Sequence, residues 1–119
     1  MSLIALLLSP VAFAATHTVD GSGTADFSSV QDAVDASTSG DTIEIAAGTY
    51  TENVTISAKT LVIEGSGVGA TIIAGDGTAT AFSVSSGGLN LSHMTISGGA
   101  QGVLLRGVVG SLSAVEVTD

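Results

Sequence analysis

Short runs of alternating apolar and polar residues fill the chain from Asp41 onward, and clusters of glycine separate them. The apolar members of the first three runs are Ile43, Ile45, Val54, Ile56, Leu61 and Ile63. A period of two is that of a β-strand with one buried face, and glycine allows the positive φ angles of tight turns. The pattern therefore predicts many short strands joined by short turns.

The segment from Ser28 to Ala36 has a helical pattern instead. Three apolar residues recur at the spacing i, i+3, i+4 and share one helix face: Val30, Ala33 and Val34. Ser28 and Gln31 have the spacing of a capping box, and Gly40 is a stop signal. We expect one amphipathic helix here, preceded by a short strand and a glycine-containing loop.

An internal repeat with an offset of 21 residues is visible in the second half of the chain. Six positions match an apolar or serine counterpart, namely Phe82, Val84, Leu91, Ser92, Met94 and Ile96 with Val103, Leu105, Leu112, Ser113, Val115 and Val117. The same offset, continued backwards, places Leu61 and Ile63 beneath Phe82 and Val84, and Ile73 beneath Met94. An offset of 18 then places Ile43 and Ile45 beneath Leu61 and Ile63. Repeats of this length are typical of solenoids, whose units bury their apolar faces against each other.

Together these patterns predict an all-β solenoid of about three to four coils. Each coil would hold two or three short strands that pair in parallel with the strands of the next coil. Inward residues would then form stacks, such as Phe82 over Val103 and Met94 over Val115. The helix around Val30 would cover the open edge of the first coil, which protects the edge from association.

The charge of the chain excludes several kinds of partner. Eleven Asp and Glu residues are balanced only by Lys59 and Arg106, so the net charge is -9. A chain this acidic repels phosphate backbones and anionic lipid headgroups, and we expect no nucleic-acid partner. The chain has no cysteine, which excludes disulfides and thiolate metal ligands.

Residues 1–15 have the character of a secretory signal peptide. The run is apolar, is too short to span a bilayer, and ends in Ala12-Phe13-Ala14, which favours cleavage after Ala14 or Ala15. The alternative is a buried N-terminal element. We expect three regions: the signal peptide, a strand and capping helix at 16–40, and β-helix coils at 41–119. The mature chain would be secreted or cell-surface, without a membrane span.

Two stretches of the chain resemble the N-terminal part of the pectin lyase-like superfamily: VDGSGTADFSSVQDAVDASTSGDTIEIAAGTYTENVTI and LVIEGSGVGATIIAGDG. The likeness is greatest to the opening of pectinesterases and of related bacterial secreted repeat proteins. The resemblance implies a right-handed single-stranded parallel β-helix. It also implies an extracellular polysaccharide as a partner, although this fold carries many functions.

The pectinesterase signatures are only partly present. Gly48, Tyr50 and Glu52 match the first signature, which the resemblance implies to be mainly structural. Gln101 begins a stretch similar to the second signature, whose glutamine stabilises an oxyanion. The signatures that carry the acid/base and nucleophilic aspartates are absent, and Asp119 lacks their context. We therefore expect a non-catalytic segment in which Gln101 is a turn residue. The alternative is an N-terminal fragment of a pectinesterase-like carbohydrate esterase or another polysaccharide-active enzyme, with Gln101 as its one catalytic candidate.

The remaining candidates favour structural roles. His17 and His93 lack a metal-binding neighbour at a suitable spacing, and the segment 75–77, Gly-Asp-Gly, is a turn rather than a calcium loop. We expect no metal and no cofactor. Asn53 and Asn90 fit the glycan acceptor pattern, which matters only in a host that glycosylates. The last predicted strand has no cap, so we expect further coils or another chain to cover the C-terminal coil edge.

Overall fold

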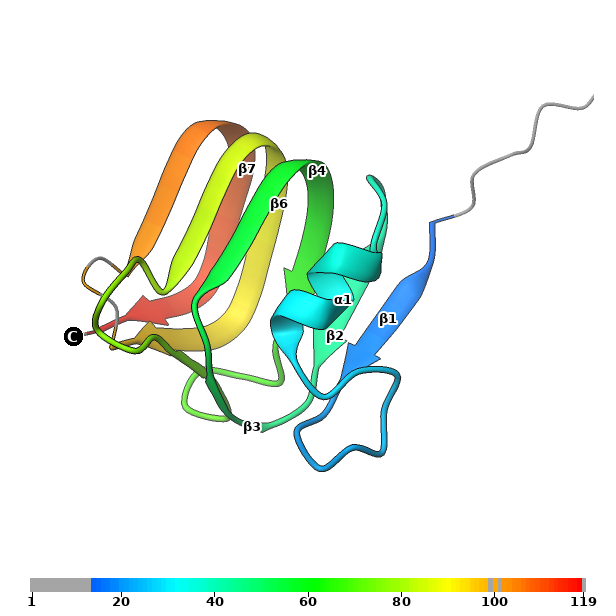
Figure 1. Cartoon of the computed structure of the whole chain (residues 1–119), viewed down its shortest axis with the longest axis vertical. Coiled ribbons are helices and arrows are strands. Elements are labelled where there is room, and N and C mark those ends of the chain that lie inside the picture. The colour runs from blue at the N-terminus through cyan, green and yellow to red at the C-terminus, as the bar shows by residue number, and fades with distance from the viewer. Residues whose placement is uncertain (1–13, 99, 101, 119) are drawn as a thin grey trace, which may run out of the picture.

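A computed structural model of the chain describes residues 14–98, 100 and 102–118. Within these residues it contains seven strands and one helix (Figure 1). In chain order the elements are β1 (Thr16–Val19), α1 (Val30–Ala36), β2 (Thr42–Ile45), β3 (Gly48–Thr51), β4 (Val54–Glu64), β5 (Thr71–Ala74), β6 (Phe82–Ser97) and β7 (Val103–Val117). The mostly-β architecture with one short helix, predicted from the sequence, is confirmed. No helix in this part of the chain is long and apolar enough to cross a membrane.

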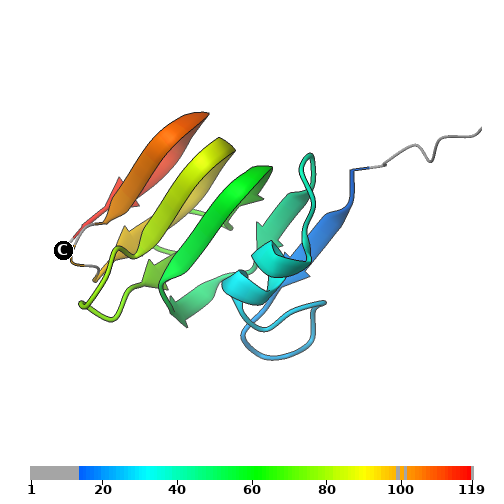
Figure 2. The same cartoon turned by 45° about the horizontal axis from the view of Figure 1, so that its top comes forward.

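All the strand pairs are parallel. The strands run in the order β1-β2-β4-β6-β5-β3, and β7 pairs with β6. They curl around a common interior, with α1 at one end of the stack and β7 at the other (Figures 1 and 2). The long strands turn corners at left-handed residues with φ between 53° and 58°, namely Ala58, Ser86, His93 and Ala114. Each long strand therefore contributes several straight segments around one core.

The interior is filled by the apolar members of the alternating runs. Val54 of β4 pairs with Phe82 of β6, which pairs with Val103 of β7, so these three residues form one inward stack. Val54 and Phe82 are fully buried, whereas the intervening Thr55 is exposed. The predicted alternation of buried and exposed positions is thus present.

The predicted repeat is correct in one half of the stack and wrong in the other. All six predicted pairs between β6 and β7 are present with the offset of 21 residues. Further back, Val54 and Ile56 lie beside Phe82 and Val84, in place of Leu61 and Ile63. Two other predicted partnerships are also replaced, because Ile73 pairs with Ile96 and Ile43 pairs with Ile63.

Unequal corners explain the errors in register. Residues 65–70 connect β4 to β5, whereas at the equivalent place β6 turns at the single residue His93. The offset between paired residues is consequently 28 at Glu64 and Ser92 but 23 at Ile73 and Ile96. A fixed offset cannot follow a stack whose corners differ in length.

The helix starts and stops at different residues from those predicted. Its N-cap is Ser29, whose side chain accepts a hydrogen bond from the Asp32 backbone N–H at 3.1 Å, so the predicted Ser28–Gln31 capping box is wrong. The helix ends at Ala36, before Gly40, because the Ser37 backbone N–H turns back to the carbonyls of the last turn. The predicted apolar face of the helix is buried, as expected.

Gln31 lets the helix stand in for a strand beside the start of β4. Its side-chain oxygen accepts from the Thr55 backbone N–H at 2.8 Å, and its side-chain nitrogen donates to the Thr55 carbonyl at 3.0 Å. A neighbouring strand would make the same two kinds of bond. The Gln31 amide thus covers part of the β4 edge, which supports the capping role predicted for the helix.

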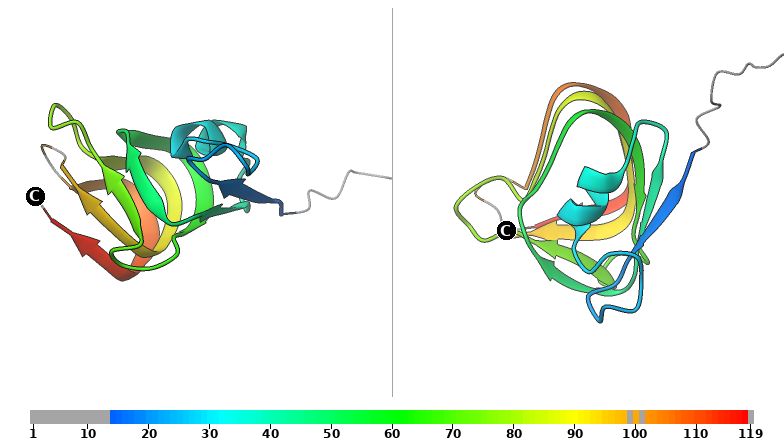
Figure 3. Two further views of the ribbon diagram at one scale, coloured as in Figure 1. Left: turned by 90° about the horizontal axis from the view of Figure 1, so that it is seen from below. Right: turned by 45° about the vertical axis from the view of Figure 1, so that its right-hand side comes forward.

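Opposite charges hold the two ends of α1. The Glu52 carboxylate accepts from the backbone N–H groups of Val30 and Gln31, at 2.9 and 2.8 Å. The Lys59 ammonium donates to the Val34 carbonyl at 2.6 Å. An anion at the N-terminus and a cation at the C-terminus both favour the helix dipole. The chain between β3 and the first corner of β4 therefore clamps the helix from both ends (Figure 3).

Candidate functional site

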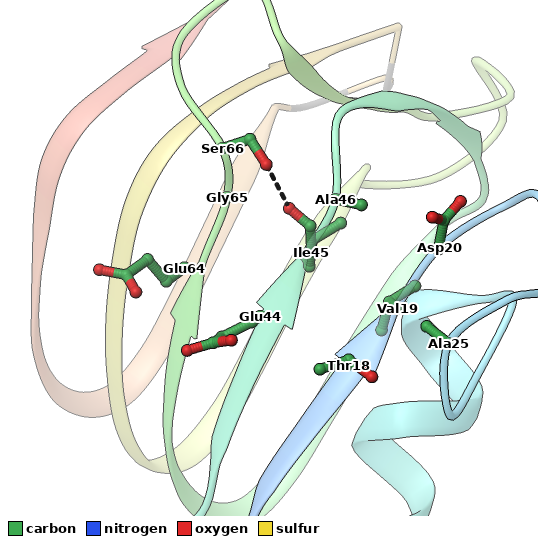
Figure 4. A pocket seen from close by; sticks show the side chains of 10 residues that line it. All are labelled: Thr18, Val19, Asp20, Ala25, Glu44, Ile45, Ala46, Glu64, Gly65 and Ser66. Atoms are coloured by element: carbon green, nitrogen blue, oxygen red, sulfur yellow. Dashed lines mark hydrogen bonds between the residues drawn. The ribbon is translucent and has the colours of Figure 1, made fainter.

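A groove of about 320 Å³ lies on the outer side of β1, β2 and β4, toward the carboxyl ends of these strands. Its central residues are Thr18, Glu44 and Glu64, which pair in register across the three strands and point outward (Figure 4). The complete lining is Thr18, Val19, Asp20, Ala25, Glu44, Ile45, Ala46, Glu64, Gly65 and Ser66. The groove is therefore a direct product of parallel pairing, which aligns outward residues that are far apart in sequence.

Hydrogen bonds to the end of β2 fix one rim of the groove. The Ser66 hydroxyl donates to the Ile45 carbonyl at 3.0 Å, which is the dashed line in Figure 4. The buried Thr71 hydroxyl also donates to the Ile45 carbonyl, at 3.1 Å, and accepts from the Ser66 backbone N–H. The corner at Gly65 and Ser66 is consequently held against β2.

The groove is strongly acidic. Glu44 and Glu64 stand opposite each other on adjacent strands, an arrangement of like charges that costs stability. Asp20 lines the same groove, and its pKa is lowered because the Ser22 backbone N–H donates to its carboxylate. The Nδ1 atom of His93 lies 4.0 Å from the Glu64 carboxylate, and both side chains are about half exposed. The groove thus offers hydrogen-bond acceptors with negative charge.

The outward row continues beyond the groove. Glu64 pairs with Ser92 of β6, and Ser92 pairs with Ser113 of β7. Adjacent strands are about 4.8 Å apart, so the row places a carboxylate or hydroxyl at this interval along the stack. The chain therefore presents a straight line of polar side chains, with its acidic part in the groove.

The first pectinesterase signature serves packing in this structure. Tyr50 is buried, and its hydroxyl donates to the Ala46 carbonyl at 2.9 Å. Its ring lies next to Gly48 and Gly21, so it is not exposed for stacking on a sugar. Glu52 binds the helix N-terminus as described above. Gln101, the one catalytic candidate, lies outside the described residues, as do the predicted signal residues 1–13 and Asp119.

Sequence reasoning missed a histidine–aspartate pair near the N-terminus. The Nε2 atom of His17 lies 3.0 Å from the Asp41 carboxylate, which also accepts from the backbone N–H groups of Ala15 and Thr38. These two backbone donors, with His17, hold the Asp41 pKa well below its usual range. Asp41 thereby ties the start of β1 to the turn before β2. No motif joins residues 24 positions apart, so only the fold reveals the pair.

The Asp41 contacts predict sensitivity to acid. Because folding lowers the pKa of Asp41, its contribution to stability is complete above pH about 4 and is lost as the pH falls below that value. We expect Asp41→Asn to melt well below the wild type at pH 6, and the difference to shrink toward pH 2. Melting temperatures over this range measure the effect, with Asp32→Asn as the control on the exposed side of α1. A difference independent of pH would contradict the prediction.

The segment 75–77 forms a turn, as predicted. The Asp76 carboxylate accepts from the backbone N–H and the hydroxyl of Thr78 and from the Asn53 side-chain amide. The Thr78 hydroxyl, followed by Asn53, lowers the Asp76 pKa to about 2. Asn53, a candidate glycan acceptor, is therefore engaged in closing this turn. In the described part of the chain, no group of three or more acidic or histidine side chains is placed to hold a metal ion.

Comparison with known proteins supports the fold. No family model matches the chain, and no curated protein sequence matches it. A solved structure of a pectin methylesterase mutant in complex with a hexasaccharide is similar, with a TM-score of 0.56 and 20% sequence identity. The match covers 76% of this chain and 31% of that enzyme, so the chain spans about a third of its length. The likeness shows that this chain shares the parallel β-helix architecture of that enzyme.

Proposed function

We propose that this chain is a secreted or cell-surface segment of a right-handed parallel β-helix, with about three to four coils, that contacts an extracellular polysaccharide without catalysis. The observation that carries the proposal is the outward row of Thr18, Glu44, Glu64, Ser92 and Ser113 beside the groove. A linear polymer with regularly spaced hydroxyl groups can follow such a row. The similarity to a pectin methylesterase bound to a hexasaccharide supports a carbohydrate as the ligand.

The charges of the groove favour an uncharged polymer. The carboxylates of Glu44, Glu64 and Asp20 accept hydrogen bonds from sugar hydroxyls, and charge-assisted bonds are stronger than neutral ones. The same carboxylates, in a chain of net charge -9, repel a polyanion. A methyl-esterified or otherwise neutral polysaccharide is therefore a better ligand than a de-esterified, polyanionic pectin.

Binding to two forms of one polymer tests this proposal. We expect the purified chain to bind highly methyl-esterified pectin and to bind fully de-esterified pectin much more weakly, in affinity electrophoresis or calorimetry. The double variant Glu44→Gln with Glu64→Gln keeps the side-chain shapes but removes both charges. We expect it to bind the esterified polymer about tenfold more weakly, because two charge-assisted hydrogen bonds become neutral.

A matched variant controls for net charge. Asp32→Asn with Asp35→Asn removes two carboxylates from the exposed side of α1 and should leave binding unchanged. Wild-type affinity in the Glu44→Gln, Glu64→Gln variant would exclude the groove as the binding site. Equal binding of the two pectins would contradict the preference for a neutral polymer.

A second candidate function is that of an N-terminal portion of a pectinesterase-like carbohydrate esterase or another polysaccharide-active enzyme. It is favoured by the similarity of residues 101–105 to the second signature and by the activity named for the structural neighbour. Hydrolysis of methyl-esterified pectin by the purified chain, lost in Gln101→Ala, would establish it. Aspartate signatures encoded in frame after Asp119 would also favour the enzyme, whereas further glycine-rich coils would favour the scaffold.

A further inference from the structure

The last layer of the stack presents an unpaired strand edge and an apolar surface. Among the described residues, β7 pairs only with β6, and its other edge has no partner strand (Figure 2). Leu112 and Val117 occupy inward positions, yet their side chains are 46% and 48% exposed. Their partners on β6, Leu91 and Ile96, are 1% and 0% exposed. One more layer of chain would bury this surface, which we call the β7 face.

The opposite end of the molecule is not a suitable partner for the β7 face. There, α1 lies over the stack, and Gln31 already bonds both backbone groups of Thr55. The free edge of β1 is covered by Phe27, whose backbone N–H donates to the Thr18 carbonyl and whose carbonyl accepts from the Asp20 backbone N–H. Head-to-tail stacking of copies would require these bonds to break. A second copy can, however, bring its own β7 face.

The shape of β7 suits a two-fold arrangement. The ladder with β6 is interrupted between Arg106 and Val108 and again between Ser113 and Val115, where the strand turns corners. Ser111 lies near the middle of the segment between the two corners. Rotation about an axis through Ser111 therefore superimposes the two bends of one copy on those of the other and makes the strands antiparallel. Inward positions meet inward positions, because strand side chains alternate with a period of two.

The charges of β7 match under the same rotation. Arg106 lies five residues before Ser111, and Glu116 lies five residues after it, so each Arg106 stands opposite the Glu116 of the other copy. Both residues are exposed. A two-fold interface forms this ion pair twice, and opposite charges on directly facing cross-strand positions are favourable.

We propose that the β7 face binds a second copy of this chain by antiparallel pairing of the two β7 strands around Ser111. The dimer buries Leu112 and Val117 of both copies and places Arg106 of each against Glu116 of the other. This arrangement is independent of the polysaccharide groove, which lies on the outer side of β1, β2 and β4.

Charge reversal tests the pairing. We expect the purified chain to sediment as a dimer that dissociates on dilution. Arg106→Glu faces two like-charged pairs and should raise the dissociation constant about tenfold or more, and Glu116→Arg should do the same. Combining the two substitutions restores opposite charges at both positions and should recover the wild-type dimer. Asp32→Arg, which makes the same charge change as Glu116→Arg at the other end of the molecule, should have no effect.

A cysteine variant tests the axis directly, because the chain has no cysteine of its own. Oxidised Ser111→Cys should form a covalent dimer, while Thr49→Cys on the exposed side of β3 should remain monomeric. A wild-type monomer at all concentrations, which is the result if only a further coil of a longer chain covers this face, would overturn the proposal. Filaments, or a double charge variant that fails to recover the dimer while circular dichroism shows it folded, would overturn it as well.

Discussion

Replacing Phe82 by alanine is expected to destabilise the fold by about 3–5 kcal/mol, because it removes a large buried side chain and leaves a cavity. Phe82 is fully buried between Val54 and Val103, and both neighbours belong to other layers of the stack. The loss therefore weakens the contact of β6 with both β4 and β7. Since domains of this size have unfolding free energies of about 5–15 kcal/mol, the variant should retain little stability.

Denaturant unfolding of the Phe82→Ala variant measures this effect. Val62→Ala is the matched control, because Val62 lies on β4 but points outward and is 37% exposed. We expect the control to unfold within about 0.5 kcal/mol of the wild type. Similar losses in the two variants would mean that the interior described here does not supply the stability of the fold.

Replacing Gly87 by alanine is the second change with a large expected effect. Gly87 follows the corner at Ser86 with φ of 102°, a conformation that costs other residues about 1–3 kcal/mol. A Cβ atom at this position would also overlap the carbonyl oxygen of Lys59, its partner residue on β4. Relieving the overlap requires β4 and β6 to separate locally, and overpacking of this kind costs about 1–3 kcal/mol more.

Gly40→Ala separates the two costs. Gly40 has nearly the same backbone conformation, with φ of 98°, but a Cβ atom there would meet no atom within 4 Å. We expect both variants to be destabilised and Gly87→Ala to be the less stable by about 1–3 kcal/mol in denaturant unfolding. Equal stabilities would show that close contact of β4 and β6 at the corner is not required.

Local patterns explain what could be predicted of the fold. The alternation at Ile43 and Ile45 reports which side of a strand is buried, and the helical spacing of Val30 and Val34 reports the apolar face of the helix. Both signals arise within a few residues. The register of β6 against β7 was also predictable, because the corners of these two neighbouring strands have matching lengths and leave a constant offset.

Contacts between distant residues explain what could not be predicted. The row through Glu44 and Glu64 depends on a register of 20 residues that the unequal corners conceal. Glu52 and Lys59 reach the helix ends only because α1 lies across the stack beside them. The candidate groove was missed for the same reason, since its lining comes from four separate segments. The sequence did identify the Gly48–Glu52 signature as a feature of the family, but not the bonds that Glu52 makes.

The corner between β4 and β5 can vary in length without disturbing the layers around it. Six residues, 65–70, cross this corner in one layer, and His93 alone crosses it in the next, yet the flanking strands stay paired. Because Gly65 and Ser66 line the groove, chain inserted after them would extend beside it. This corner is therefore a site where evolution or engineering can graft a loop, and so change what the surface recognises while the interior stays the same.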